Sequence, residues 1–534
     1  MSGHRAIPEG DRRRLHPRKR VVIVGGGIAG LAAAEALASS HPDRFEISVH
    51  EAKRVTGGRA GSFTDSQTGE AVDYCRHVAM GCCTNLMALL RRVGLAEAWI
   101  PQRTLTFLHP QARPSRFRPT HWLPAPLHLL STLRGLRFLD RRRRGEILIG
   151  LWRLMRSPDA GLTGVTAADW LRENRQSRVA IERFWDVILI SALGERTTRV
   201  SMAAARKVLI DGFAAAHGAS DVLVPNRPLS EIFGQELPLA IGGLGVRVDT
   251  SRPVREIGWE ARGAGQTWRD GIAAPARLSV IGREAVSADH VISAVPWHAA
   301  AKLLGGVADV AGLSVGRWDE IPASPISGIH LWFDRPITSR PHAVLVGTTA
   351  QWLFRDEAVS RIAAAPSSPT RETGHYYQVV ISAAERTGPS GRDPLVRQVV
   401  GELRRLFPQA RQARLLRHRV VTDPLAVFSI RPEVETVRPP ARTLLPCLHL
   451  AGDWTATGWP ATMEGAVISG RLAAASLCET EGLTPPTIDP GLPRGWLARQ
   501  LIVPSAKNGP GERRGPGQRR GPGQRGGLGA IALP

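Results

Sequence analysis

The stretch that decides the fold is RVVIVGGGIAGLAAAEALASSHPDRFEISVHEA, residues 20–52. It opens on a β-branched run that suits a buried parallel strand, and the helix that follows ends at a His-Pro-Asp breaker cluster. Between strand and helix lies Gly25-x-Gly27-x-x-Gly30. Gly25 can make the tight turn, Gly27 lets the backbone approach a pyrophosphate, and Gly30 lets the helix pack close to the strand. The helix N-terminus then presents unpaired N–H groups to the phosphates.

A glycine-rich turn by itself is weak evidence, because such turns are common. Here a second strand, residues 45–49, follows the helix and leads to Glu51. An acidic residue at this distance from the turn reaches the ribose hydroxyls of an adenosine. The strand, turn, helix and acid together predict a dinucleotide-binding unit.

A second glycine pair follows the acid, in EAKRVTGGRAGSF (51–63). Gly57-Gly58-Arg59 resembles the second motif of the FAD-binding amine oxidase and carotenoid (phytoene) desaturase superfamily, and this resemblance implies FAD as the cofactor. In physical terms, glycines let the loop pass close to the cofactor, and Arg59 supplies a fixed cation. A solvated arginine in a turn is the alternative interpretation.

A third region reads LHLAGDWTATGWPATMEGA (448–466). A short buried strand ends at Gly452-Asp453, and a small-residue helix begins near Met463 and Glu464. The N–H groups at such a helix start can stabilise negative charge on a flavin. In the superfamily the matching Asp bonds to the ribityl or pyrophosphate part of FAD, which implies that role for Asp453. A helix or loop cap is the alternative.

Two internal segments, 254–257 and 290–296, resemble the strand pair that returns to the nucleotide domain in this superfamily. The resemblance implies that Val254 contacts the adenine through its backbone. Taken without the flanking motifs, both segments are ordinary core strands.

Four further segments resemble the hydroxysqualene dehydroxylases, the squalene-associated, FAD-dependent desaturase-like family of bacterial hopanoid synthesis. They are VDYCRHVAMGCCTNLMALLRRVGL (72–95), RFWDVILISALGERTTRVSMAAARKVLIDGF (183–213), VPNRPLSEIF (224–233) and GDWTATGWPATMEGA (452–466). The resemblance covers most of residues 20–480 and departs at Arg76, where a Gln is expected. It implies that FAD, reduced by an outside donor, delivers hydride from flavin N5 to hydroxysqualene as water leaves, which gives squalene.

This chemistry needs an acid near the departing hydroxyl and a dry apolar tunnel for a C30 isoprenoid. The candidates for the acid, or for polar positioning, are Asp73, His77 and Glu195. Each has a structural alternative: Asp73 as a turn or cofactor-loop residue, His77 as a satisfied core histidine, and Glu195 as a helix cap.

We expect an α/β fold class, with a Rossmann-type FAD-binding domain and an interleaved α+β substrate-binding domain. The predicted division is a basic disordered tail (1–18), FAD-binding segments (19–100, 236–306, 426–480), substrate-domain segments (101–235, with membrane contact, and 307–425) and a Gly/Pro/Arg-rich tail (481–534).

The cysteines indicate a reducing, cytoplasmic setting without a metal site. There are five, an odd number, with no CxxC pair and no accompanying histidine spacing, which argues against a disulfide framework and against zinc. Three arginines at 12–14 precede an apolar stretch and superficially suggest an export signal. The glycines of the turn and the charge of Glu35 interrupt that stretch, so we expect no export.

The net charge of +23 is concentrated in three segments. Residues 1–20, 103–156 and 505–534 carry 20 of the 23 charges, whereas nucleic-acid binders spread basic residues over a folded face with stacking aromatics between them. Within the second segment, apolar residues 122–139 lead into four arginines at 141–144 and an amphipathic stretch at 147–155. This pattern is typical of a peripheral anchor on an anionic membrane surface, here the inner face. A helical lid with a solvated charged face is the alternative.

Three other functions are compatible with the sequence. A carotenoid or phytoene desaturase would run the redox step in the opposite direction on a similar polyene. A flavin amine oxidase would use a lysine near flavin N5, and only Lys207 and Lys302 lie between the FAD motif regions. A nucleic-acid-binding protein would use the basic tails, with an affinity that falls steeply with salt; we expect no nucleic-acid partner.

Overall fold

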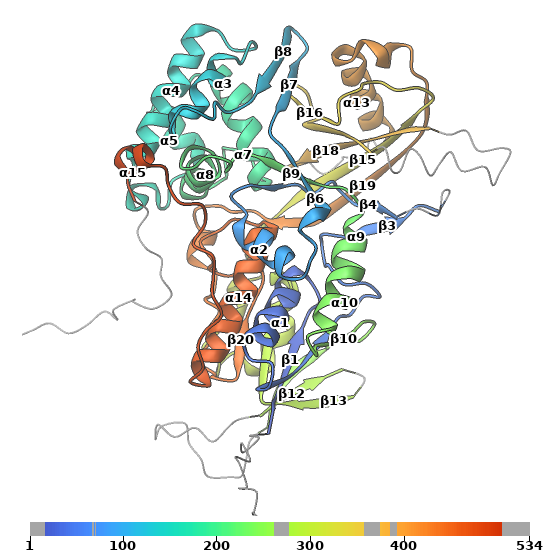
Figure 1. The fold of residues 1–534 in the computed structure, drawn as a ribbon, viewed down its shortest axis with the longest axis vertical. Helices are drawn as coiled ribbons and strands as arrows, with labels where there is room; N and C mark the ends of the chain where they lie inside the picture. Colours follow the sequence, from blue (N-terminus) through green and yellow to red (C-terminus); the bar gives the residue numbers. More distant parts are fainter. Residues whose placement is uncertain are drawn as a thin grey trace, which may run out of the picture.

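The structure is a computed structural model that describes residues 17–66, 69, 71–260, 277–282, 284–356, 374–384 and 392–504. These residues form two units, each built around a central sheet, drawn at the bottom and at the top of Figure 1. Residues 1–16 and 505–534 of the two predicted tails lie outside the described residues.

The lower unit is built on a five-stranded parallel sheet. Three regions of the sequence supply its strands, so the chain leaves the unit and returns twice. In spatial order the strands are β10 (Arg247–Asp249), β2 (Phe45–His50), β1 (Lys19–Val24), β14 (His290–Ser293) and β20 (Leu448–Leu450). The Rossmann-type unit and the return of residues 290–296 to it are confirmed.

The alternation of β1 sends its side chains into two different cores. Val21 and Ile23 pack with the helices α1 (Ile28–Ser40), α10 (Leu237–Gly242) and α14 (Met463–Thr480). Val22 and Val24 pack on the other face, against α11 (Trp297–Leu304) and the antiparallel strands β11 (Glu256–Glu260), β12 (Arg277–Ile281) and β13 (Ala285–Ala288). A parallel sheet covered on both faces explains why the strand is a continuous apolar run.

Helices α1 and α14 approach each other very closely. A Cβ on Gly470 of α14 would lie 2.2 Å from the Ala29 carbonyl oxygen, so the contact requires glycine. Beside it, buried Glu35 of α1 pairs with Arg92 Nε at 2.7 Å and with Arg471 Nη1 at 3.1 Å. Because Arg92 ends α2 (Thr84–Arg92), this ion cluster holds three helices together.

The upper unit is built on a seven-stranded sheet that draws on two regions of the sequence. Its order is β19 (Leu415–Phe428), β15 (Ala323–Phe333), β18 (His375–Ser382), β17 (Trp352–Arg355), β16 (His342–Leu345), β7 (Leu105–His109) and β8 (Ala112–Phe117). Ile329 and Leu331 pack under α13 (Arg392–Leu406). His330 and Trp332 face the other way, toward β3 (Ser62–Thr64) and β4 (Ala71–Asp73) of the chain's first third. The predicted interleaving of an α/β and an α+β unit is confirmed.

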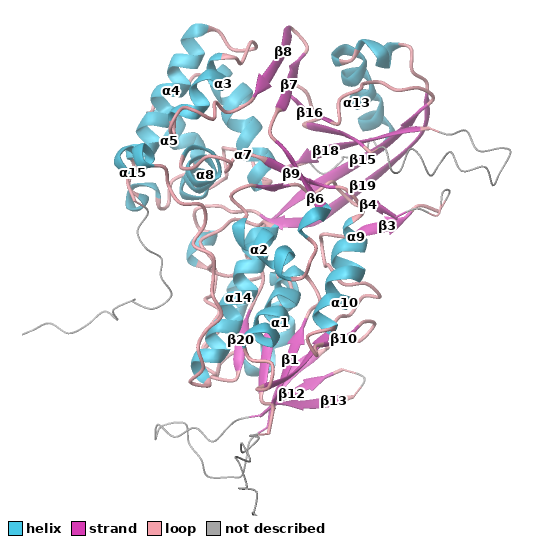
Figure 2. Ribbon diagram, viewed as in Figure 1, coloured by secondary structure: helices cyan, strands magenta, loops and turns pink. Residues whose placement is uncertain are grey.

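Helices cover the side of the upper unit drawn at the left of Figure 2. They are α3 (Leu130–Arg134), α4 (Arg141–Arg156), α5 (Ala167–Glu173), α7 (Asp186–Leu193) and α8 (Met202–Leu209). Over the described part of the chain, no helix is both long enough and apolar enough to cross a membrane.

A last helix, α15 (Trp496–Leu501), corrects the predicted start of the C-terminal tail. Ala498 and Ile502 are buried in the core of the helical region, and the Val503 N–H donates to the Met155 carbonyl at 2.9 Å. Residues 481–504 therefore belong to the folded body, because a few apolar side chains anchor a stretch whose composition resembles a linker.

Two further predicted details are corrected. The strand that returns beside β2 is β10, whereas residues 254 and 255 lie in the loop after it and residues 256 and 257 begin β11. The helical stretch formed by α9 (Leu229–Glu231), a π-helical turn and α10 crosses the predicted boundary at 235, because α10 packs on α1. A strand of three residues is too short to show an alternating pattern in sequence.

An ion cluster at the edge of the lower unit predicts acid sensitivity. Glu481, after α14, accepts from His290 Nε2 at 2.9 Å and from Lys19 Nζ at 2.7 Å, and these contacts lower its pKa from 4.5 to about 2, with the His290 hydrogen bond as the largest cause. The depressed pKa stabilises the fold above the ordinary Glu pKa, and this contribution is lost as the pH falls from about 4.5 to about 2. Its size is at most about 3 kcal/mol, because solvent screens an ion cluster at the edge of the unit.

Glu481→Gln should therefore remove that part of the pH dependence. We expect urea unfolding between pH 5 and pH 2 to show a shallower loss of stability than in the wild type. Glu433→Gln, at an exposed glutamate, is the control and should follow the wild-type curve. Equal slopes for wild type and Glu481→Gln would contradict the assignment.

Candidate functional site

The first glycine turn has a geometry that requires glycine at two positions. Gly25 has a φ of +110°, and a Cβ on Gly30 would lie 2.0 Å from the Gly25 carbonyl oxygen. A Cβ on Gly27 would meet nothing nearer than the Gly58 Cα at 4.0 Å. Gly25 and Gly30 thus serve the packing of the turn, whereas Gly27 borders open space at the start of α1.

The second glycine pair lies directly against the first. The Gly57 N–H donates to the Gly26 carbonyl at 2.8 Å, and Gly27 forms a parallel bridge with Gly57. Gly57 and Gly58 have φ values of +97° and +66°, which only glycine adopts readily. The structure brings both predicted motifs together at one place.

Glu51 is fixed beside these turns. Its Oε2 accepts from the Gly26 N–H at 2.7 Å, and its Oε1 accepts from the Lys53 N–H at 2.8 Å. The residue is buried and follows the carboxyl end of β2, the edge at which ligands bind in open parallel sheets.

These features fit a dinucleotide. Helix α1 begins after Gly27, and no side chain of the described residues caps its first N–H groups, so they remain available to an anion. Gly27 leaves room for a diphosphate, and Glu51 lies beside the position that the ribose would take. The individual contacts of Gly25, Gly27, Gly30 and Glu51 with the cofactor stay predictions.

Arg59 connects the second motif with the third. Its guanidinium donates to Asp453 Oδ1 at 2.5 Å and to the Ala426 carbonyl at 3.0 Å, and lies 5.9 Å from the centre of the Trp297 ring. Asp453 is buried, and Gly452 before it has a φ of +134°. Arg59 is therefore not a solvated arginine in a turn. The ion pair joins two motifs that are far apart in sequence.

Arg438, for which no sequence motif predicts a role, organises the loop after Asp453. It donates to the carbonyls of Asp453, Trp454, Thr455 and Trp459 and to the Thr457 hydroxyl, at distances between 2.5 and 3.3 Å. Burial lowers the pKa of Arg438 to about 10, although Asp453 and Glu435 act in the opposite direction. In a chain with 65 arginines, one more arginine before a Pro-Pro pair carries no distinguishing signal.

The start of α14 faces the same region. Thr462 caps the helix by accepting from the Gly465 N–H at 3.1 Å, and Met463, the first helical residue, is partly exposed. Glu464 turns away: its carboxylate accepts from the N–H groups of Asn85 and Leu86 at the start of α2. Its side chain therefore caps another helix, so that any contact of Glu464 with a cofactor would have to come from its backbone.

Val254 lies in the loop between β10 and β11 and is partly buried. Neighbouring backbone groups tie this loop to the ribose acid: the Arg252 N–H donates to the Glu51 carbonyl and the Ser251 N–H to the Lys53 carbonyl, both at 2.8 Å. Val254 is thus placed near Glu51, although not on the strand expected from the sequence.

Asp73 is the most deeply buried acid candidate beside the second motif. Its Oδ1 accepts from the Ser62 hydroxyl at 2.7 Å and from the Leu229 N–H at 2.8 Å, while Oδ2 has no hydrogen-bond partner among the described residues. Arg76 Nη1 lies 3.6 Å from Oδ2. Burial raises the pKa of Asp73 despite the nearby Arg76 cation, so the protonated form is favoured relative to a solvated aspartate.

His77 is half-buried and follows Asp73 by four residues. Burial is the main cause of its lowered pKa, and the positive charge of Arg59 is close enough to add to the shift. Its Nδ1 lies 2.8 Å from the Cys75 carbonyl oxygen. Because a carbonyl only accepts, Nδ1 carries the proton, and neutral His77 then has an acceptor at Nε2. This tautomer suits a hydrogen-bond acceptor better than an acid.

The contacts of Glu195 do not suit the predicted acid role. One oxygen accepts from the Ser429 hydroxyl, and the other from Arg199 Nε and the Arg196 N–H, both at 2.9 Å. Burial disfavours the charge, but the hydrogen bonds from Ser429, Arg199 and Arg196 outweigh it and lower the pKa of Glu195. Glu195 is therefore ionised, and its hydrogen bonds connect the end of α7 with the end of β19.

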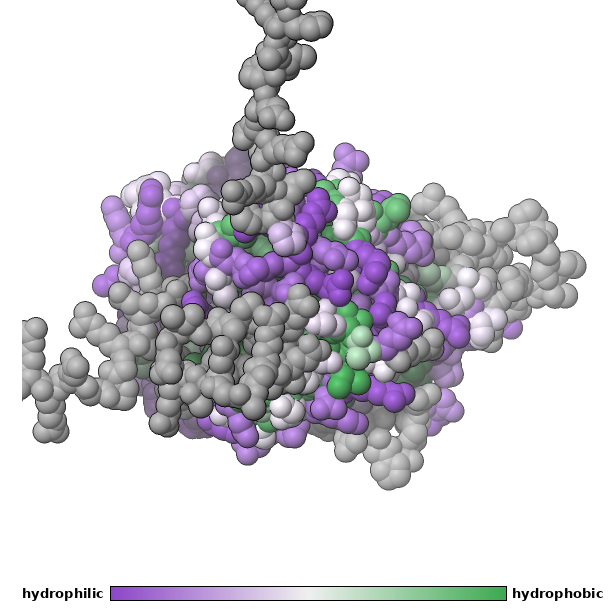
Figure 3. Space-filling model, turned by 90° about the horizontal axis from the view of Figure 1, so that it is seen from below, coloured by the Kyte–Doolittle hydropathy of each residue, from purple (hydrophilic) through white to green (hydrophobic). Residues whose placement is uncertain are grey.

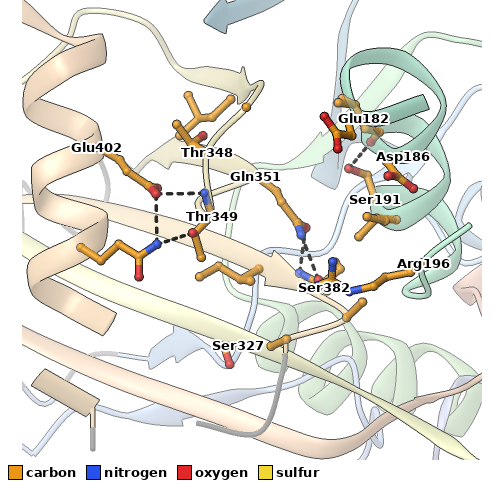
Figure 4. A pocket seen from close by; sticks show the side chains of 18 of the residues that line it. Glu182, Asp186, Ser191, Arg196, Ser327, Thr348, Thr349, Gln351, Ser382 and Glu402 are labelled. Atoms are coloured by element: carbon orange, nitrogen blue, oxygen red, sulfur yellow. Dashed lines mark hydrogen bonds between the residues drawn. The ribbon is translucent and has the colours of Figure 1, made fainter. Parts of the chain in front are cut away.

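The described residues also line a cleft of about 770 Å³ in the upper unit. Glu182, Asp186 and Ser191 line it on the α7 side, and Thr349 and Glu402 line it on the α13 side (Figure 4). None of its lining residues belongs to the glycine motifs or to the 452–464 segment. The cleft wall mixes these polar side chains with apolar ones such as Val187, Ile190 and Leu345, so it does not match the wholly apolar tunnel expected for a C30 isoprenoid.

Comparisons with known proteins found similar proteins over most of the chain. A probable zeta-carotene desaturase of Synechococcus elongatus is 26% identical over 502 residues, which cover 87% of this chain and 99% of that protein. A 15-cis-phytoene desaturase of Narcissus pseudonarcissus is 25% identical, covering 86% and 79%. The structure of cyclohexylamine oxidase from Brevibacterium oxydans covers 87% of this chain, and the chain covers all of it, with a TM-score of 0.59 and 20% identity.

The family model described as flavin containing amine oxidoreductase matches residues 28–478, from the first residue of α1 to the last turn of α14. That range includes the second and third motifs, which the Arg59–Asp453 ion pair joins, and it begins directly after Gly27 of the first. The chain therefore belongs to the flavin containing amine oxidoreductase family and is an oxidoreductase with FAD as its cofactor.

Proposed function

We propose that this protein acts on a long isoprenoid and that its reaction is the reductive dehydroxylation of hydroxysqualene to squalene. Relatives named as carotene and phytoene desaturases support the isoprenoid class. The four segments that resemble hydroxysqualene dehydroxylases support the specific reaction. One of them supplies Asp73 and His77, and another supplies Asp453.

The reaction breaks a C–O bond, forms a C–H bond and releases water. Bound reduced FAD supplies the hydride. The chain itself must provide a proton for the departing hydroxyl and must keep water away from the reacting carbon. An outside reductant then reduces the flavin again.

The observation that carries the proposal is the buried Asp73 carboxyl. Its raised pKa favours the protonated form, and Oδ2 has no hydrogen-bond partner among the described residues. The loop that leads from Gly57 and Gly58 to β3 positions it, through Ser62. A desaturation has no hydroxyl to protonate, so a buried acid beside the flavin motif favours dehydroxylation. His77, as an acceptor at Nε2, can orient the hydroxyl by accepting a hydrogen bond from it.

Asp73→Asn should lower the rate of squalene formation about 100-fold or more, the usual contribution of a general acid. The asparagine oxygen can still accept from Ser62 and Leu229, so the flavin content should stay that of the wild type. The rate in the wild type should fall as the pH rises through the raised pKa of Asp73, and Asp73→Asn should lack this limb. Asp309→Asn, at an exposed aspartate, is the matched control.

The assay uses purified protein reduced anaerobically, with hydroxysqualene added and squalene measured by mass spectrometry. Absence of squalene from the reduced wild-type protein would refute the reaction. Squalene formation with unchanged kinetics and pH profile in Asp73→Asn would refute the acid role and leave the reaction intact.

Carotenoid-type desaturation is the second candidate, supported by the names of the relatives. The oxidised protein would then convert phytoene or zeta-carotene to a more unsaturated product, and the flavin would become reduced. Parallel incubation of the oxidised protein with these polyenes separates the two candidates.

A further inference from the structure

The helical corner of the upper unit exposes apolar side chains to solvent. On α4, Leu148, Ile149 and Trp152 are exposed, while Ile147 and Leu154 on the inner side are buried. Residues at these spacings are neighbours on a helix surface. Only the inner face of α4 packs against the rest of the fold. The outer apolar face contacts no other apolar surface among the described residues.

Two other segments extend this face. Trp122 precedes α3 with 72% of its surface exposed, and Trp496 begins α15 with 60% exposed. A Cβ on Gly495 would lie 3.3 Å from the Ala125 Cβ, and Val503 bonds to Met155, so both segments adjoin the end of α4. We define the docking surface as Trp122, Leu127, Leu148, Ile149, Trp152 and Trp496. It contains every tryptophan whose side chain is exposed among the described residues.

Positive charge surrounds this apolar set. Residues 134–156 contain eight arginines and two acidic residues, and those acids, Asp140 and Glu146, pair with Arg143 at 3.1 Å and Arg142 at 3.4 Å. The remaining cations have no acidic partner in the described part of the chain, and five of them are exposed: Arg134, Arg137, Arg141, Arg153 and Arg156.

We propose that the docking surface binds the surface of an anionic phospholipid bilayer. Tryptophan rings favour the boundary between headgroups and acyl chains. Leu148 and Ile149 can enter that boundary while guanidinium groups contact lipid phosphates. In a dimer through a two-fold interface, the same arginine-rich patches would face each other, which costs free energy.

The position of the surface agrees with this role. Helices α3, α4 and α15 lie at the corner of the upper unit, far from the five-stranded sheet (Figure 1). Figure 3 shows the opposite end of the molecule, where the uncovered surface is mainly hydrophilic with small apolar clusters. The proposal stands on this surface alone and does not rest on the proposed substrate.

Co-sedimentation of the full chain with vesicles tests the proposal. We expect strong binding to an equal mixture of phosphatidylcholine and phosphatidylglycerol, and weak binding to phosphatidylcholine alone. The variant Leu148→Ser/Ile149→Ser/Trp152→Ser should bind the mixed vesicles about tenfold less tightly or worse. Arg134→Gln and Arg141→Gln should each lower the affinity about fivefold.

The control is Leu239→Ser/Leu444→Ser, at two leucines that are 79% and 76% exposed outside the docking surface. It should bind like the wild type, and all variants should retain bound flavin. Unchanged vesicle binding by the triple serine variant would overturn the proposal, because the arginine-rich tails alone would then explain any salt-sensitive binding. The proposal would also be overturned if the wild type did not bind vesicles and gel filtration showed it as a larger oligomer than the triple serine variant.

Discussion

Gly30→Ala is expected to abolish FAD binding. The added Cβ would lie 2.0 Å from the Gly25 carbonyl oxygen and 3.3 Å from the Ala294 Cβ. The first of these atoms belongs to the backbone of the turn, so the turn and the start of α1 must shift. We expect the purified protein to lack flavin absorbance and to lose about 3 kcal/mol of unfolding free energy in urea, the upper range for overpacking a core.

The matched control is Gly401→Ala in α13, where a Cβ meets no atom within 4 Å. In an open helical position alanine stabilises by about 0.5–1 kcal/mol over glycine. This variant should keep its flavin and unfold at slightly higher urea concentration. Full flavin occupancy with unchanged stability in Gly30→Ala would show that the turn is not packed as described.

Arg438→Met is expected to lose FAD through the loop that follows Asp453. The guanidinium donates to four carbonyls and one hydroxyl between Asp453 and Trp459. Methionine fills a similar volume but leaves these acceptors without a donor and Asp453 with one fewer cation nearby. Removing one member of such a buried charged network costs about 3–5 kcal/mol, and we expect FAD to dissociate during dialysis.

Two variants make this experiment specific. Arg442→Met removes an arginine with a 64% exposed side chain, whose carboxylate neighbour Glu479 is 3.8 Å away, and should keep flavin and stability. Arg438→Lys keeps the charge but cannot supply the planar set of donors, so it should retain an intermediate flavin content. Wild-type flavin retention in Arg438→Met would refute the organising role of this residue.

The parts of the site that sequence predicted best depend on local geometry. A strand, a turn with Gly25 and Gly30, and a helix start form within a few residues, and only glycine fits the backbone contacts there. Gly57 and Asp453 were also found, because their motifs have characteristic local composition. The fold class followed from these motifs, since a parallel strand must be paired with others that arrive later in the chain.

Side chains whose partners come from elsewhere in the chain could not be predicted in the same way. Glu464 matches a helix start that faces a cofactor, yet its carboxylate reaches the first N–H groups of α2. Glu195 is a candidate general acid by residue type, but hydrogen bonds from Ser429 and Arg199 keep it ionised. Arg438 showed no signal at all, because its role comes from five acceptors on a loop that folds around it.

By itself, the sequence determined that this chain binds a dinucleotide on a Rossmann-type sheet, because turn geometry and strand burial are short-range properties. Only the tertiary structure decided that Arg59 pairs with Asp453, that residues 481–504 belong to the folded body, and that Trp496 lies beside α4. The physical reason is that contacts between residues far apart in sequence depend on how the elements pack together. A local sequence pattern does not show which distant groups will be in contact.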